Sequence, residues 1–89
     1  MSYGDVKLRI SVKVGVAYGT DTELVRDALI QAAEKIENIM KNPEPTVLFR
    51  DFGESSLDFE LLTWIEDPAR RFVTESDLRY TIARVFRHK

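Results

Sequence analysis

The chain contains no cysteine and a single histidine, His88. The lack of thiols excludes disulfides, iron–sulfur clusters and thiolate zinc sites, and one imidazole excludes any site that needs two. No apolar run approaches the roughly 18 residues that a membrane-spanning helix requires. The first residues show no basic segment followed by an apolar one, so the sequence has no sign of a signal peptide.

An excess of charge of one sign is also missing, because 13 basic residues stand against 15 acidic ones and the net charge is −2. A dedicated nucleic-acid binder usually carries a basic excess, so we expect no nucleic-acid partner. Hydrophobic residues form 44% and charged residues 31% of the 89 positions. This composition is typical of a globular protein, and the length predicts one domain over residues 1–89 with a single modest core.

Strict alternation of apolar and polar residues marks the first element, a strand at residues 6–16. One face carries Val6, Leu8, Ile10, Val12, Val14 and Val16. The other face carries Lys7, Arg9, Ser11 and Lys13. One face should therefore meet a core, and the other should meet solvent or a partner.

A long amphipathic helix is predicted next. Thr20 and Glu23 fit a capping box, and Asp21 is a competing N-cap. Apolar residues then recur at spacings of three and four, at Leu24, Val25, Ala28, Leu29, Ala32, Ile36, Ile39 and Met40. The pattern predicts a helix of about 19 residues. It should stop at the Asn-Pro-Glu-Pro segment, residues 42–45, because proline cannot supply the next amide.

Two further strands, at residues 46–52 and 56–65, are separated by so few residues that they predict a hairpin. One face of the second strand carries Leu57, Phe59, Leu61 and Ile65. The opposite face carries Ser56, Asp58, Glu60, Leu62 and Trp64. A second helix should follow, with Val73 as hydrophobic staple and Thr74 as N-cap. Its apolar stripe consists of Leu78, Ile82, Val85 and Phe86.

The order β-α-β-β-α predicts a ferredoxin-like α+β sandwich with both helices on one face of a mixed sheet. The last strand should lie between the first two, and the usual fourth strand is missing. Its absence would leave the first strand with an open edge, so we expect the chain to be a piece of a larger protein. The predicted core comprises Val12, Val14, Leu29, Ile36, Phe49, Phe59, Leu61, Leu78 and Ile82.

Few residues suggest a catalytic or metal-binding site. Asp58 and Glu60 lie on one strand face, and paired carboxylates can perform acid–base work or bind a metal. Pairing with the basic residues of the first strand explains them better, and we expect partners among Lys7, Arg9 and Lys13. The sequence therefore predicts no catalytic residue, no metal site and no cofactor.

Two loop motifs also have ordinary explanations. Ser55 and Ser56 follow a glycine, a pattern that can indicate a nucleophilic serine. The only histidine that could act as its base is next to last in the chain, so we interpret both serines as turn residues. Gly15 and Gly19 precede a helix start that could attract a phosphate, yet the lysine and glycine spacing of known nucleotide loops are absent.

The last part of the chain is basic, with Arg70, Arg71, Arg79, Arg84, Arg87 and Lys89. We favour a role in complementing the helix dipole over attachment to nucleic acid or lipid. Leu62 and Trp64 lie on the outer strand face, and a tryptophan beside a leucine there makes them candidates for a subunit contact.

Two stretches together resemble the small-conductance mechanosensitive (MscS-like) channel family. Residues 15–21, GVAYGTD, resemble its GVAY-x-[ST]-D junction before a long helix, and residues 52–61, FGESSLDFEL, resemble its G-x-SS-[LIV]-x-F-x-[LV] hairpin. Trp64 falls where the family often has an aromatic. Val25, Leu29, Ile39, Pro43 and Val47 fit the same register. The resemblance covers about residues 6–88.

The resemblance implies the C-terminal α/β domain, which forms the wall of a vestibule on the cytoplasmic side of the inner membrane. The family assembles as a heptamer that opens under membrane tension and passes ions and small osmolytes. Its members continue beyond this point into a short strand that helps to close the vestibule. We therefore expect the isolated chain to be a monomer or weak dimer, and membrane contact to occur only through parts outside it.

The sequence leaves two other classes of function open. A ferredoxin-like regulatory or small-ligand-binding module would use a sheet edge or a helix start. A small enzyme would need a catalytic constellation, which the sequence does not offer. Several apolar spans upstream of Val6 would favour the channel, and a fused catalytic or transporter domain would favour the ligand-binding module.

Overall fold

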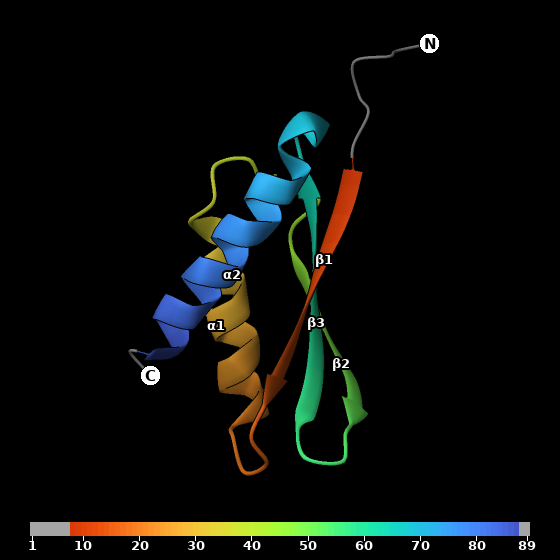
Figure 1. Ribbon diagram of the computed structural model, residues 1–89, viewed down its shortest axis with the longest axis vertical. Helices are drawn as coiled ribbons and strands as arrows, with labels where there is room; N and C mark the ends of the chain where they lie inside the picture. Colours follow the sequence, from red (N-terminus) through yellow and green to blue (C-terminus); the bar gives the residue numbers. More distant parts are fainter. Residues whose placement is uncertain (1–7, 88–89) are drawn as a thin grey trace.

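A computed structural model describes residues 8–87 as a two-layer α+β domain, with two helices packed on one face of a three-stranded sheet (Figure 1). The elements are β1 (Leu8–Val16), α1 (Thr22–Glu34), β2 (Thr46–Phe52), β3 (Leu57–Ile65), a 3₁₀ turn (Pro68–Arg70) and α2 (Arg71–Arg87). This order confirms the predicted β-α-β-β-α fold. Val6, Lys7 and His88 lie outside the described residues.

The sheet has the strand order β1-β3-β2, as predicted, and β3 pairs antiparallel with both neighbours. Val12 lies opposite Leu61 in one ladder, and Phe49 lies opposite Phe59 in the other. Because β1 and β2 each pair only with β3 within residues 8–87, both are edge strands there. Among these residues, no helix combines the length and apolar character that crossing a membrane requires.

The core lies between the sheet and the helices, and most of its predicted members are buried. Val12, Leu29, Phe59, Leu61, Leu78 and Ile82 are buried, and Val14 and Ile36 are partly buried against them. Phe49 is the exception, because it is 42% exposed. Its ring stacks on Phe59 at 4.7 Å between centroids, but β2 is an edge strand that the helices cover only in part.

Helix α1 is shorter than predicted. It ends at Glu34, and the following residues form turns instead of continuing to Met40. The cause is competition from the sheet: the Met40 amide donates to the Trp64 carbonyl at 2.7 Å, and the Asn38 carbonyl accepts from the Glu66 amide at 3.0 Å. Ile39 forms a bridge with Ile65 and is buried there. Long-range backbone pairing thus ends the helix well before the proline segment.

Asp21, and not Thr20, is the N-cap of α1. Its carboxylate accepts hydrogen bonds from the amides of Glu23 at 3.0 Å and Leu24 at 3.4 Å. Thr20 instead donates its hydroxyl to the Ala17 carbonyl at 2.7 Å, which closes the loop after β1. The two Asp21 bonds satisfy backbone amides that the first helical turn would otherwise leave free.

The predicted start of α2 is wrong. The helix begins at Arg71, directly after the 3₁₀ turn, and Asp67 caps that turn by accepting from the Ala69 amide at 3.1 Å. Thr74 is therefore not an N-cap but a helical residue, only 1% exposed. Asp67 and Pro68 form an earlier start signal, which the Val73–Thr74 pattern obscured in the sequence.

Candidate functional site

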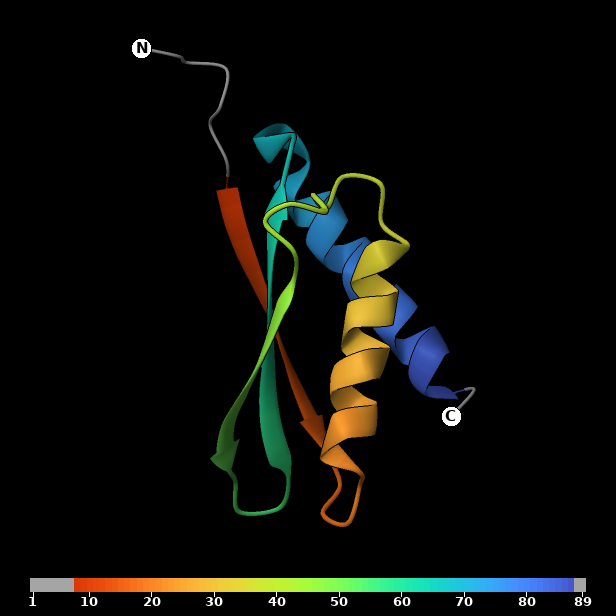
Figure 2. The same ribbon diagram turned by 180° about the vertical axis from the view of Figure 1, so that it is seen from behind.

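The sheet has an open face on the side away from the helices (Figure 2). The alternation along β3 places Leu62 and Trp64, the residues predicted to make a subunit contact, on this face. Along β3, the inward residues are buried and the intervening ones, Asp58, Glu60, Leu62 and Trp64, are half-buried. Leu62 lies opposite Ser11 of β1 and Thr46 of β2, so it sits in the middle of this face. The alternation agrees with the sequence, and the contact itself stays a prediction.

Trp64 lies beside a cation. It is opposite Arg9 in the ladder, and the guanidinium carbon of Arg9 lies 5.9 Å from the centroid of the indole. Such a cation–π contact helps to position the ring, which stays half-buried on this face. Leu62 and Trp64, with the half-buried Leu48 of β2 opposite Glu60, place apolar side chains on this face. This arrangement suits a protein contact.

The carboxylates on this face are engaged, but not by the predicted partners. Glu60 pairs with Arg50 of β2 at 3.6 Å, although Lys13 lies opposite it on β1. Asp58 lies opposite Gly15 and accepts a hydrogen bond from the Ser56 hydroxyl at 2.7 Å. Arg9 stacks on Trp64 instead, and Lys7 lies outside the described residues. Within residues 8–87, no group of three or more His, Asp or Glu side chains gathers as a metal site.

The two motifs that carry the family resemblance meet in space. Tyr18, in the loop after β1, donates its hydroxyl to the Gly53 carbonyl in the β2–β3 turn. Gly53 leaves no room for a side chain there, because a Cβ would lie 2.9 Å from the Ser56 carbonyl oxygen and 2.8 Å from an Asp58 carboxylate oxygen. The motifs therefore hold two loops together. Ser56 acts as a turn residue, as predicted.

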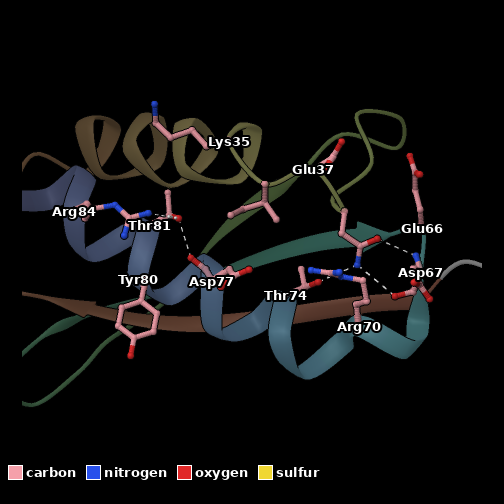
Figure 3. Close-up of a pocket in the computed structure, with 12 residues that line it drawn as sticks. Lys35, Glu37, Glu66, Asp67, Arg70, Thr74, Asp77, Tyr80, Thr81 and Arg84 are labelled. Atoms are coloured by element: carbon pink, nitrogen blue, oxygen red, sulfur yellow. Dashed lines mark hydrogen bonds between the residues drawn. The ribbon is translucent and has the colours of Figure 1, made fainter.

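A polar groove of about 690 Å³ separates the segment after α1 from α2 (Figure 3). Its charged residues have both signs: Lys35, Arg70 and Arg84 stand against Glu37, Glu66, Asp67 and Asp77. This mixture gives the groove no strong preference for a cation or an anion. The sequence did not predict this groove, because it forms only where the early end of α1 meets the early start of α2.

Asn38 lines this groove and joins three segments. Its amide nitrogen donates to the Thr74 hydroxyl at 2.9 Å and to the Asp67 carbonyl at 3.3 Å, and its side-chain oxygen accepts from the Asp67 amide at 3.0 Å (Figure 3). Thr74 is buried, so Asn38 supplies a partner that solvent cannot replace. Asn38 therefore fixes the start of α2 against the segment that follows α1.

Replacing Asn38 with alanine should lower the free energy of unfolding by about 1–3 kcal/mol, because it leaves the buried Thr74 hydroxyl without this partner. Denaturant unfolding followed by circular dichroism measures the loss. Asn42→Ala is the control, since Asn42 is exposed in the next loop and should change stability by less than about 0.5 kcal/mol. Equal losses in the two variants would contradict the structural role of Asn38.

Comparison with known proteins agrees with the fold and with the motifs. The family "Mechanosensitive ion channel MscS, C-terminal" matches residues 10–89. An uncharacterized MscS family protein of Haemophilus influenzae is 41% identical over 78 residues, which cover 88% of this chain and 7% of that protein. The mechanosensitive channel MscK of Escherichia coli is 41% identical over 66 residues, or 74% of this chain and 6% of that protein.

A solved structure has the same fold. The crystal structure of Helicobacter pylori MscS in the closed state matches with a TM-score of 0.87 and 31% sequence identity, over 99% of this chain and 35% of that one. The chain thus spans only a small part of the length of these relatives. With the family match over nearly its whole length, the chain belongs to the MscS family of mechanosensitive ion channels and corresponds to its C-terminal domain.

Proposed function

We propose that this domain forms part of the vestibule wall of a tension-gated channel, with a structural and assembly role. The observation that carries the proposal is the family match over residues 10–89, joined to the same fold in Helicobacter pylori MscS. The relatives named as mechanosensitive channels are far longer than this chain. The domain is accordingly one part of a longer membrane protein, on its cytoplasmic side, and other parts contact the membrane.

The domain has no catalytic activity of its own in this proposal. Among the described residues, the carboxylates of the open sheet face already bond Arg50 and the Ser56 hydroxyl. The serine turn and the loop before α1 hold each other, through Tyr18 and Gly53, and not a reacting group. These contacts account for the polar residues that would otherwise suggest an acid, a nucleophile or an anion site.

Assembly into a ring is the second part of the proposal. The full channel is a heptamer, and Leu62 and Trp64 contribute a contact outside the domain core. Their half-buried positions on the open sheet face support this role. Desolvating a tryptophan in a contact contributes more than pairing a charge at its rim, so Trp64 should dominate.

The isolated chain should sediment as a monomer or a weak dimer, because the parts that hold the ring together lie outside it. The edge of β1 is the place where two copies can add to each other's sheets. Sedimentation equilibrium of the purified 89-residue chain measures this directly. A stable heptamer at micromolar concentration would show that this segment alone carries the information for assembly, and the expectation would be wrong.

A chimera tests the function. The matching C-terminal segment of Helicobacter pylori MscS is replaced with this chain, and single-channel currents are recorded from membrane patches under suction. The chimera should open under tension, because the fold is shared along the whole segment. A chimera that reaches the membrane but never conducts, in patches where the parent channel opens, would contradict the proposal.

The contact residues are tested in the same chimera. Trp64→Ala should weaken subunit association, as the loss of a central aromatic at an interface typically costs about 2 kcal/mol or more. Phe52→Ala is the matched control, because Phe52 is also an exposed aromatic, 70% accessible, but lies on the helix-facing side of β2. Native gel electrophoresis of the detergent-solubilised channel compares the two. If both variants stay equally intact, Trp64 is not a subunit contact.

A further inference from the structure

The outer side of α2 exposes three large apolar residues on one helix. Phe72 is 77%, Tyr80 66% and Val73 52% exposed. The buried residues of the helix, which include Thr74, Leu78 and Val85, lie on its opposite side, since successive residues are 100° apart. Exposed apolar residues gathered on one helix face mark a surface that a partner covers.

Arginines share this side of the helix. Arg79 and Arg87 are exposed between and beyond the apolar residues. The acidic residues of α2 lie toward its flanks, and Glu75 already pairs with Arg71 at 3.5 Å. We call Phe72, Val73, Arg79, Tyr80 and Arg87 the α2 stripe. Because it combines aromatics with arginines and contains no carboxylate, it fits an acidic partner.

The chain itself carries such a surface on α1. Glu23, Asp27 and Glu34 are exposed and fall within 40° of one another around the helix axis, by the spacing of 100° per residue. The buried side of α1, which includes Val25, Leu29 and Ala32, lies opposite them. Asp27 pairs with its neighbour Arg26 at 3.7 Å, and both side chains are exposed. We call these three carboxylates the α1 stripe.

The two stripes cannot meet within one copy. The helices lie side by side on the sheet, with α2 over β1 and α1 over β2. Figure 1 views this layer from the side of α2, and Figure 2 views it from the side of α1. Each stripe lies opposite the buried side of its helix, and the buried sides contact the sheet and the other helix. The stripes therefore occupy opposite sides of the helix layer.

We propose that the α2 stripe of one copy docks on the α1 stripe of the next copy. This inference rests on the ring of the proposed function, because a ring of more than two subunits needs a contact between two different surfaces. The basic and acidic stripes are two such surfaces, complementary in charge and placed on opposite sides. The net charge of −2 argues against an anionic membrane as the partner, since only the α2 side would be attracted to it.

Cysteine cross-linking tests this contact, and the chain has no natural cysteine to interfere. One chain carries Asp27→Cys and a second, longer by a tag, carries Arg79→Cys. The two are mixed at high concentration and oxidised, and the products are separated by mass. We expect the mixed dimer to exceed both homodimers several-fold beyond the statistical mixture, and to decline in about 1 M NaCl, where the Debye length is about 3 Å. The control pair is Ser11→Cys with Arg79→Cys, because Ser11 is also exposed but lies on the open sheet face.

Charge reversal provides a second readout that does not depend on cross-linking. Arg79→Glu should weaken the self-association of the chain, measured by sedimentation equilibrium at low salt, because every contact between an α2 stripe and an α1 stripe then loses this arginine. Adding Asp27→Arg to the same chain should restore the self-association, since the exchanged charges again face each other in every contact. Loss of folding cannot imitate this rescue, and circular dichroism of each variant checks that both helices are retained.

The outcomes separate this contact from the proposed function. A statistical mixture of dimers, or a charge reversal without rescue, overturns the docking of α2 on α1. Binding of the chain to phosphatidylserine vesicles that Arg79→Glu abolishes, with no mixed dimer, would assign the α2 stripe to lipid and also overturn it. The currents of the chimera judge the proposed function by themselves: a conducting chimera without the mixed cross-link means that the ring is held elsewhere.

Discussion

Replacing Phe59 with alanine is expected to lower the free energy of unfolding by about 3–5 kcal/mol. Phe59 is 3% exposed, lies in the central strand of the sheet and stacks on Phe49. The truncation removes the ring from the core and leaves a cavity that two sheet neighbours and the helices cannot easily fill. Denaturant unfolding of the 89-residue chain, followed by circular dichroism, measures the loss.

Phe52→Ala serves as the matched control for Phe59. Phe52 lies in the same hairpin but is 70% exposed, so its truncation should cost less than about 1 kcal/mol. The difference between the two variants isolates the effect of burial from the loss of an aromatic ring. A loss below about 1 kcal/mol for Phe59→Ala would show that the register of β3 is wrong.

Leu29→Ala should be the other severe change, with a loss of about 2–5 kcal/mol. Leu29 is fully buried on the inner side of α1, where this helix meets the sheet and α2. Alanine favours the helical backbone, so the loss reports on packing and not on helix propensity. The same unfolding measurement applies.

Leu24→Ala is the control for Leu29, because it is the same substitution in the same helix. Leu24 is 45% exposed, so a loss of under about 1 kcal/mol is expected there. If the two variants lose equal stability, α1 does not pack on the sheet through the side that contains Leu29. A loss at Leu24 alone would mean that the helix is rotated.

Much of the fold follows from local patterns in the sequence, such as the alternation of apolar and polar residues and short turns. Alternation over residues 8–16 and 57–65 specifies which side chains face the core, because a strand has a period of two. The short turn after Phe52 and the right-handed crossover then leave one strand order, β1-β3-β2. The two loop motifs, joined through Tyr18 and Gly53, identify the family.

The two candidate contact surfaces differ in how well the sequence predicts them. Alternation alone predicts that Leu62 and Trp64 lie on the outer face, because successive residues of a strand point to opposite faces of the sheet. The sequence pattern does not predict the α2 stripe, since it places Val73 as a hydrophobic staple ahead of a helix that begins only at Thr74. Helical spacing counted from Arg71 would have placed Phe72, Arg79 and Arg87 on one side, opposite Leu78.

The sequence by itself determined the composition class, the order of elements, the inward faces and the family, because each depends on residues close together in the chain. Only the tertiary structure decided where α1 ends, since Asn38 and Met40 exchange helical bonds for bonds with residues 64–66. It also decided that Glu60 pairs with Arg50 and that Asn38 holds Thr74. These partners are separated by 10 to 36 residues, and local periodicity carries no information about which distant group completes a hydrogen bond.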